Sequence, residues 1–158
     1  MNITRPALAG LLALGLLAAP LAADAQQAGK VPRVGMLLTG SPSDTDPLTA
    51  AFRQRLRDLG HVDGQNIIVE PRWADGAQRL AGLAAELVRD RVDVIVTRGT
   101  PAAQAAKRAT STIPIVMATS GDPVGVGLVA SLARPGGNIT GHSILGPELI
   151  GKRLELLK

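Results

Sequence analysis

The chain has 158 residues, a formal net charge of +4 and a pI near 10.3, and it is 46% hydrophobic but only 1% aromatic. The basic balance raises nucleic acid as a partner, but Phe52 and Trp73 are the only aromatic side chains, too few for base stacking. The absence of cysteine excludes disulfides, thiolate metal sites and a cysteine nucleophile. His61 and His142 lack a metal-ligand spacing, so the sequence predicts no metal site. We also expect no nucleic-acid partner and no other cofactor.

Residues 1–25 have the pattern of an export signal. Arg5 precedes an apolar stretch from Ala7 to Leu17, and Pro20 and the small residues Ala23 and Ala25 follow it. A transmembrane anchor is the alternative, but the apolar run is shorter than the ~20 residues that a bilayer requires. We therefore expect cleavage after Ala25, which leaves one domain and keeps the net charge at +4.

The first half of the remaining chain alternates strands and helices. Val34 to Leu38 is a short apolar run typical of a buried strand, and Asp46-Pro47 opens a helix that Gly60 ends. The next predicted strand, Ile67 to Trp73, contains Pro71, which has no N–H to donate to a neighbouring strand. This strand is therefore expected at the edge of a sheet.

The second half continues the same alternation. An apolar stripe that includes Leu80, Leu83 and Leu87 predicts a helix, and the apolar run Val92 to Val96 predicts a central strand. The remaining predicted elements are a helix at Pro101–Ala109, a strand at Ile113–Ala118, a helix at Pro123–Leu132 and a strand at Asn138–Gly141. The sequence thus predicts an α/β fold with a parallel sheet of about five strands in the order 2-1-3-4-5 and helices on both faces.

Ligands bind such sheets where the strand order reverses, here between the first and third strands. Thr100 and Asp122 are good N-cap residues, Pro101 and Pro123 suit the first helical position, and the amides that follow have no acceptor within the helix. Such amides bind anions. The predicted ligand-binding residues are Ser41, Gly99, Thr100, Ser120, Gly121 and Asp122. The alternative is that Thr100 and Asp122 only cap their own helices.

No catalytic site is indicated. The sequence has no G-x-S-x-G elbow and no phosphate loop, and Gly125-x-Gly127 falls within a predicted helix rather than in a strand-to-helix turn. We therefore predict a binding protein, with catalytic residues and metal ligands both absent. The alternatives are an enzyme on a Rossmann-like sheet and the sensory domain of a receptor, which would keep residues 1–25 as a tether.

The last segment has an apolar stripe with no assigned partner. Pro147 opens a predicted helix, and its stripe comprises Leu149, Ile150, Leu154 and Leu157. One interpretation is a terminal helix docked on the single domain, and the other is the beginning of a second domain.

The ordered set of motifs resembles the N-terminal half of periplasmic substrate-binding proteins of ABC transporters, in the group labelled for tryptophan and tyrosine transport. The resemblance covers nearly all of the chain after residue 25. Its motifs are Phe52–Gly60, Gly64–Ile67, Arg72–Ala74, Leu83–Val88, Val92–Thr97, Gly99–Ala103, Thr112–Val116, Gly121–Gly125, Leu128–Asn138 and Gly151–Lys158.

The resemblance implies one lobe of a two-lobed, type I clamshell. It assigns residues 26–145 to the N-terminal lobe and 146–158 to the start of a second lobe that the chain does not continue. Ligand contacts in such a lobe come from the loops after the first, third and fourth strands, which here hold Ser41, Thr100 and Ser120 to Asp122. The implied ligand is an amino acid or similar small carboxylate, captured in the periplasm by a monomer and passed to a membrane permease. A single lobe is expected to bind it poorly, because closure of the clamshell supplies much of the burial.

Overall fold

The computed structural model describes residues 30–42, 47–144 and 155–156, and its compact folded unit begins at Pro32. The predicted export signal and all but Glu155 and Leu156 of the predicted second-lobe segment lie outside the described residues. None of the helices in the described ranges is long and apolar enough to cross a membrane.

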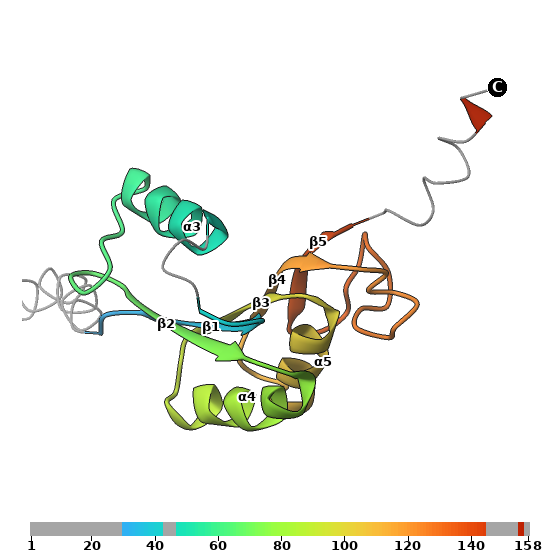
Figure 1. The fold of residues 1–158 in the computed structure, drawn as a ribbon, viewed down its shortest axis with the longest axis horizontal. Helices are drawn as coiled ribbons and strands as arrows, with labels where there is room; N and C mark the ends of the chain where they lie inside the picture. The colour runs from blue at the N-terminus through green and yellow to red at the C-terminus, as the bar shows by residue number, and fades with distance from the viewer. Residues whose placement is uncertain (1–29, 43–46, 145–154, 157–158) are drawn as a thin grey trace, which may run out of the picture. The chain divides into compact units, whose positions relative to one another are not determined.

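Five parallel strands form the sheet at the centre of the fold (Figure 1). They are β1 (Arg33–Thr39), β2 (Ile68–Ala74), β3 (Val94–Arg98), β4 (Ile115–Ser120) and β5 (Ile139–Ser143). Their order is β2-β1-β3-β4-β5, which confirms the predicted fold class and strand order. As predicted, β2 lies at the edge with Pro71 in it, and β3 lies between β1 and β4.

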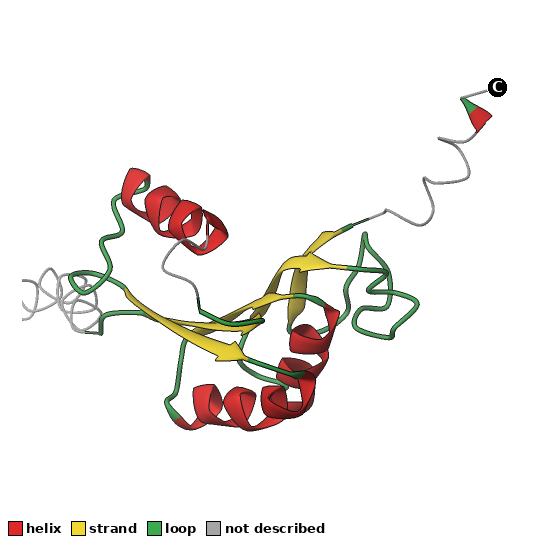
Figure 2. Cartoon of the chain, in the orientation of Figure 1, coloured by secondary structure: helices red, strands yellow, loops and turns green. Residues whose placement is uncertain are grey.

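Helices cover both faces of the sheet, as predicted. Helix α3 (Pro47–Asp58) lies on one face, and α4 (Leu80–Arg89) and α5 (Thr100–Ala109) lie on the other (Figures 1 and 2). A short 3-10 helix, Ala77–Arg79, leads into α4. The two faces are therefore covered by unequal numbers of helices.

The core differs correspondingly between the two faces. On the α4–α5 face, Leu37, Ile95 and Ile115 of the sheet are completely buried. Helix α5 meets them with small side chains, the buried residues Ala102, Ala103, Ala105 and Ala106. On the α3 face, Phe52 and Leu56 are only half-buried and Leu48 is 57% exposed, so α3 covers this face incompletely.

One predicted helix is absent. The segment Pro123–Leu132 forms a series of turns rather than a helix (Figure 2). The predicted cap is present, since the Gly125 amide donates to the Asp122 carboxylate over 2.8 Å, but Gly125 and Gly127 are each about 1 kcal/mol less favourable than alanine in a helix. The carbonyls of Gly127 and Leu128 instead accept from Lys107 Nζ of α5, over 2.7 and 3.1 Å. The prediction of a helix, which rested on the Asp122 cap and on Pro123, was therefore wrong, since two carbonyls of the segment pair with a side chain of α5.

A β-bulge in β4 turns the end of this strand. Thr97 of β3 pairs with Met117, whereas the next residue, Arg98, pairs with Thr119, so Ala118 is the extra residue. Side chains alternate along a regular strand, and one extra residue reverses which face the following side chains occupy. Ser120 consequently turns toward the α5 face, where it is only 1% exposed.

The close approach of β5 to β4 predicts that Gly141→Ala destabilises the fold. Gly141 has φ +136°, and an added Cβ would lie only 2.2 Å from the Met117 carbonyl oxygen of β4. We expect a loss of about 2–4 kcal/mol in the free energy of unfolding, measured by urea denaturation followed by far-UV circular dichroism. The matched control is Gly137→Ala, because nothing lies within 4 Å of a Cβ there; equal losses in the two variants would contradict the prediction.

Candidate functional site

The carboxyl ends of β1, β3 and β4 meet at one edge of the sheet, where the strand order reverses. The predicted strand boundaries were too early at this edge, since β3 continues to Arg98 and β4 to Ser120. Ser120 is therefore the last residue of a strand rather than a loop residue. The helix that leaves this edge, α5, begins with Thr100 directly after Gly99.

Thr100 does not cap its own helix. Gly99 occupies the N-cap position with φ +91°, a conformation that favours glycine, and Thr100 is the first helical residue. The Thr100 hydroxyl instead accepts a hydrogen bond from the Gly121 amide over 3.0 Å and lies 3.2 Å from the Ser120 hydroxyl. It thus joins the start of α5 to the end of β4, and we call Thr100, Ser120 and Gly121 the hydroxyl cluster.

The two hydroxyls of the hydroxyl cluster have one proton more than their mutual hydrogen bond uses. A hydroxyl group has one proton and two acceptor lone pairs. The hydrogen bond between Thr100 and Ser120 uses one of their two protons, and the Gly121 amide supplies its own. Within the described residues, no second acceptor takes the other hydroxyl proton. Ser120 is buried and Thr100 half-buried, and either hydroxyl can donate to the other.

The backbone amides at this edge are only partly available. The Gly99 amide donates to the Thr119 carbonyl over 3.0 Å, and the Gly121 amide donates to Thr100. The amides of Thr100 and Ala102 lie in the first turn of α5 and have no acceptor within the helix. Of the amides predicted to be available at this edge, the amides of Thr100 and Ala102 therefore remain, next to the hydroxyl cluster.

Two predicted site residues make no hydrogen bond to the hydroxyl cluster in the described part of the chain. The Asp122 carboxylate accepts from the Gly125 amide and is directed into its own turn. Ser41 is exposed in the loop after β1, and no hydrogen bond joins it to the cluster within the described part of the chain. The structure thus brings together Gly99, Thr100, Ser120 and Gly121 but not the whole predicted set.

Arg98 and Trp73 form a contact at the same edge that sequence reasoning missed. The Arg98 guanidinium carbon lies 5.2 Å from the centroid of the Trp73 ring, and Nη2 donates to the Thr39 carbonyl over 3.1 Å. Leu38 of β1 pairs with both residues, so the arginine side chain passes over β1 to reach β2. Trp73 lies in the edge strand β2, as the predicted edge strand implied, but the sequence gave no signal for an arginine so distant along the chain.

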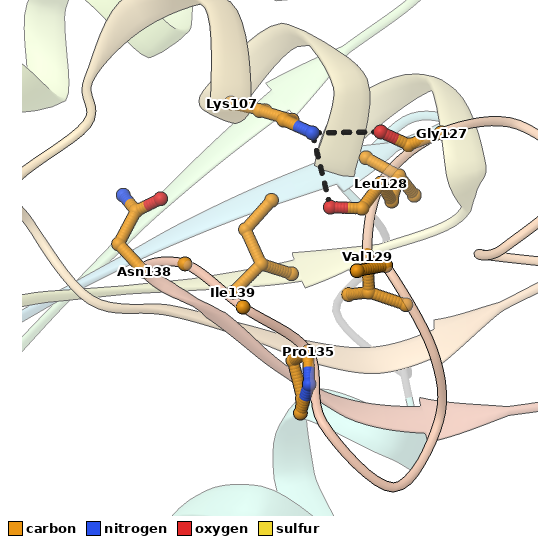
Figure 3. Close-up of a pocket in the computed structure, with 10 residues that line it drawn as sticks. Lys107, Gly127, Leu128, Val129, Pro135, Asn138 and Ile139 are labelled. Atoms are coloured by element: carbon orange, nitrogen blue, oxygen red, sulfur yellow. Dashed lines mark hydrogen bonds between the residues drawn. The ribbon is translucent and has the colours of Figure 1, made fainter.

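A cavity of about 400 Å³ lies away from this edge (Figure 3). It is lined by the end of α5 and by the backbone around Gly127–Ala130 and Pro135–Ile139. Lys107 is the charged residue in its wall, and its ammonium group already donates to two carbonyls. Since this cavity lies at the opposite end of α5 from Thr100, it does not belong to the site at the carboxyl edge.

Comparison with known proteins identifies the family. A family model described as ABC transporter substrate binding protein matches residues 42–158. The chain belongs to the ABC transporter substrate-binding protein family. This membership confirms the predicted resemblance and agrees with a binding protein rather than an enzyme.

Two relatives of this substrate-binding protein are named for, or were solved with, an aromatic amino acid. The Tyrosine-binding protein of Clostridioides difficile (strain R20291) is 41% identical over 114 residues, which cover 72% of this chain and 32% of that protein. An ABC domain from Streptococcus pneumonia, solved in complex with L-Trp, matches with a TM-score of 0.66 and 31% identity over 72% of this chain and 39% of that chain.

A third relative is the ligand-free, open structure of a substrate binding protein with adhesive properties from Clostridium difficile. It matches with a TM-score of 0.71 and 33% identity over 80% of this chain and 43% of that chain. The present chain thus spans between 32% and 43% of the length of these relatives.

The contacts of Thr100 predict that Thr100→Val destabilises the carboxyl edge. Valine keeps the shape but removes the oxygen, which leaves the Gly121 amide and the Ser120 hydroxyl without their partner. We expect a loss of about 1–3 kcal/mol in the free energy of unfolding and faster hydrogen exchange at the Gly121 amide. Thr100→Ser keeps the oxygen and is the control. Unchanged exchange at Gly121 in Thr100→Val would contradict the assigned hydrogen bond.

Proposed function

We propose that this chain captures a small ligand for an ABC importer by binding the ligand's carboxylate at the hydroxyl cluster. The observation that supports this proposal is the spare hydroxyl proton of the Thr100–Ser120 pair beside the first-turn amides of α5. Neutral donors held at a helix N-terminus stabilise a carboxylate without a metal or a charged partner. Gly99 supports the site through the turn that starts α5, and Ser41 and Asp122 are the outer candidates for polar contacts.

The proposed ligand is an aromatic amino acid. Support comes from two relatives, since one is named a tyrosine-binding protein and another was solved with L-Trp. We further propose that residues 26–145 act as one lobe of a clamshell and that a second lobe, of which residues 146–158 are the start, closes over the ligand. The relatives are more than twice as long as the region they share with this chain, and the hydroxyl cluster lies at an open edge.

The proposed location is the periplasm, reached through a cleaved signal at residues 1–25. The proposed partner is a membrane permease of the ABC type, which the protein serves as a monomer. Support comes from family membership and from the signal-like pattern of the first residues.

Titration with ligands that differ only in their carboxyl group tests the binding proposal. We expect tyrosine to shift the backbone amide resonances of Thr100 and Gly121 in the chain without residues 1–25, because its carboxylate accepts from the hydroxyl cluster. Tyrosinamide has the same side chain but no carboxylate and is the matched control. Equal shifts with the two ligands, or none with tyrosine, would contradict the proposal. Tight binding by this chain alone, measured by calorimetry, would contradict the need for a second lobe.

Expression of the complete chain tests the proposed export. Cleavage after Ala25 should give a periplasmic product whose N-terminal residue is Gln26, as determined by mass spectrometry of the cell fractions. A variant with Leu12→Arg and Leu14→Arg should stay unprocessed, because two charges interrupt the apolar segment. A product that retains residues 1–25 in the membrane fraction would favour a tethered protein instead.

A further inference from the structure

An apolar cavity of about 240 Å³ lies between α3 and the sheet. Its walls include Met36 and Leu38 of β1, Phe52 of α3 and Val96 of β3. Two further wall residues, Arg98 and Thr119, lie at the carboxyl ends of β3 and β4. The cavity therefore extends to the edge of the sheet that carries the hydroxyl cluster.

The β4 bulge connects the cavity with the hydroxyl cluster. It pairs Thr119 with Arg98, so both residues belong to one row across the sheet, and it turns the next residue, Ser120, to the opposite face toward Thr100. Thr119 thus lines the cavity while its neighbour Ser120 is part of the cluster. The cavity and the cluster thus reach the same edge of the sheet from its two opposite faces.

Among the described residues that line the cavity, Arg98 is the cation. The Arg98 guanidinium is planar, stacks on Trp73 and is fixed by the Thr39 carbonyl, so its orientation is set before any ligand binds. Planar cations attract the faces of aromatic rings, and apolar walls favour burial of a ring. The volume lies below the roughly 300–1,000 Å³ of pockets that enclose a whole drug-sized ligand, and it suits a single side chain.

We propose that this cavity, with Arg98 stacked on Trp73 in its wall, binds the aromatic ring of the ligand whose carboxylate occupies the hydroxyl cluster. The inference rests on the proposed function and adds the residues that select an aromatic side chain. Arg98 contributes a cation–π contact, and Phe52 and Leu38 contribute apolar surface. A small amino acid such as alanine, which has no ring, would use the hydroxyl cluster alone.

Trp73 provides a direct test, because it is the only tryptophan and the chain contains no tyrosine. In the chain without residues 1–25, we expect phenylalanine to shift both the Gly121 amide resonance and the Trp73 indole N–H resonance. Alanine, which has the carboxylate but no ring, should shift Gly121 and leave the indole unchanged. If phenylalanine shifts Gly121 but not the indole, the ring subsite is wrong and the proposed function stands. If neither ligand shifts Gly121, the proposed function fails and the inference with it.

Substitution of Arg98 tests the selectivity. Arg98→Met keeps a long side chain without the cation and should weaken phenylalanine binding about 2- to 30-fold while leaving alanine binding unchanged. Arg98→Lys, which keeps the charge but loses the planar group, should give a smaller loss. Arg108→Met, an exposed arginine in the last turn of α5, is the matched control. Equal weakening of phenylalanine and alanine by Arg98→Met would overturn the inference, and if that variant does not fold, the indole measurement on the unchanged protein decides.

Discussion

The close packing of α5 on the sheet determines where the hydroxyl cluster lies. Four buried alanines form the inner face of this helix, and side chains of this size let the helix backbone approach β3 and β4. The first residue of the helix, Thr100, is thereby placed over the end of β4, where its hydroxyl receives the Gly121 amide. A larger residue at any of these four positions would lift the helix and separate two segments that are 20 residues apart in sequence.

The order of the strands could be predicted from the sequence, because the residues that indicate it each determine the place of their own strand. Pro71 cannot donate to a neighbouring strand, and the near-continuous apolar run from Val92 to Val96 indicates cover on both faces, so one strand was expected at the edge and the other at the centre. The β4 bulge had no such signal, because alternation along Ile115–Ser120 looks the same with or without an extra residue. The turns after Asp122 were also missed, since Lys107 of a different element holds their carbonyls.

The loops of the candidate site could be predicted, whereas the roles of individual side chains could not. Strand order alone places the ends of β1, β3 and β4 at one edge, and the predicted residues Gly99, Thr100, Ser120 and Gly121 do gather there. Local sequence rules predicted that Thr100 caps its own helix, but its hydroxyl accepts a hydrogen bond from the Gly121 amide, just after β4. The stack of Arg98 on Trp73 joins β3 to β2 across β1, and a contact between residues so far apart leaves no pattern in the sequence.

Helix α3 covers its face of the sheet only partly, and this affects the order in which parts of the protein unfold. Helix α3 is attached mainly through Phe52 and Leu56, both half-buried, whereas α4 and α5 share a continuous core with the sheet. Segments with little buried apolar surface open at a lower free energy than the whole molecule. Trp73 packs on the α3 side. Its emission during denaturation therefore follows the departure of α3, while the circular dichroism signal follows the larger remaining unit, and the two transitions separate.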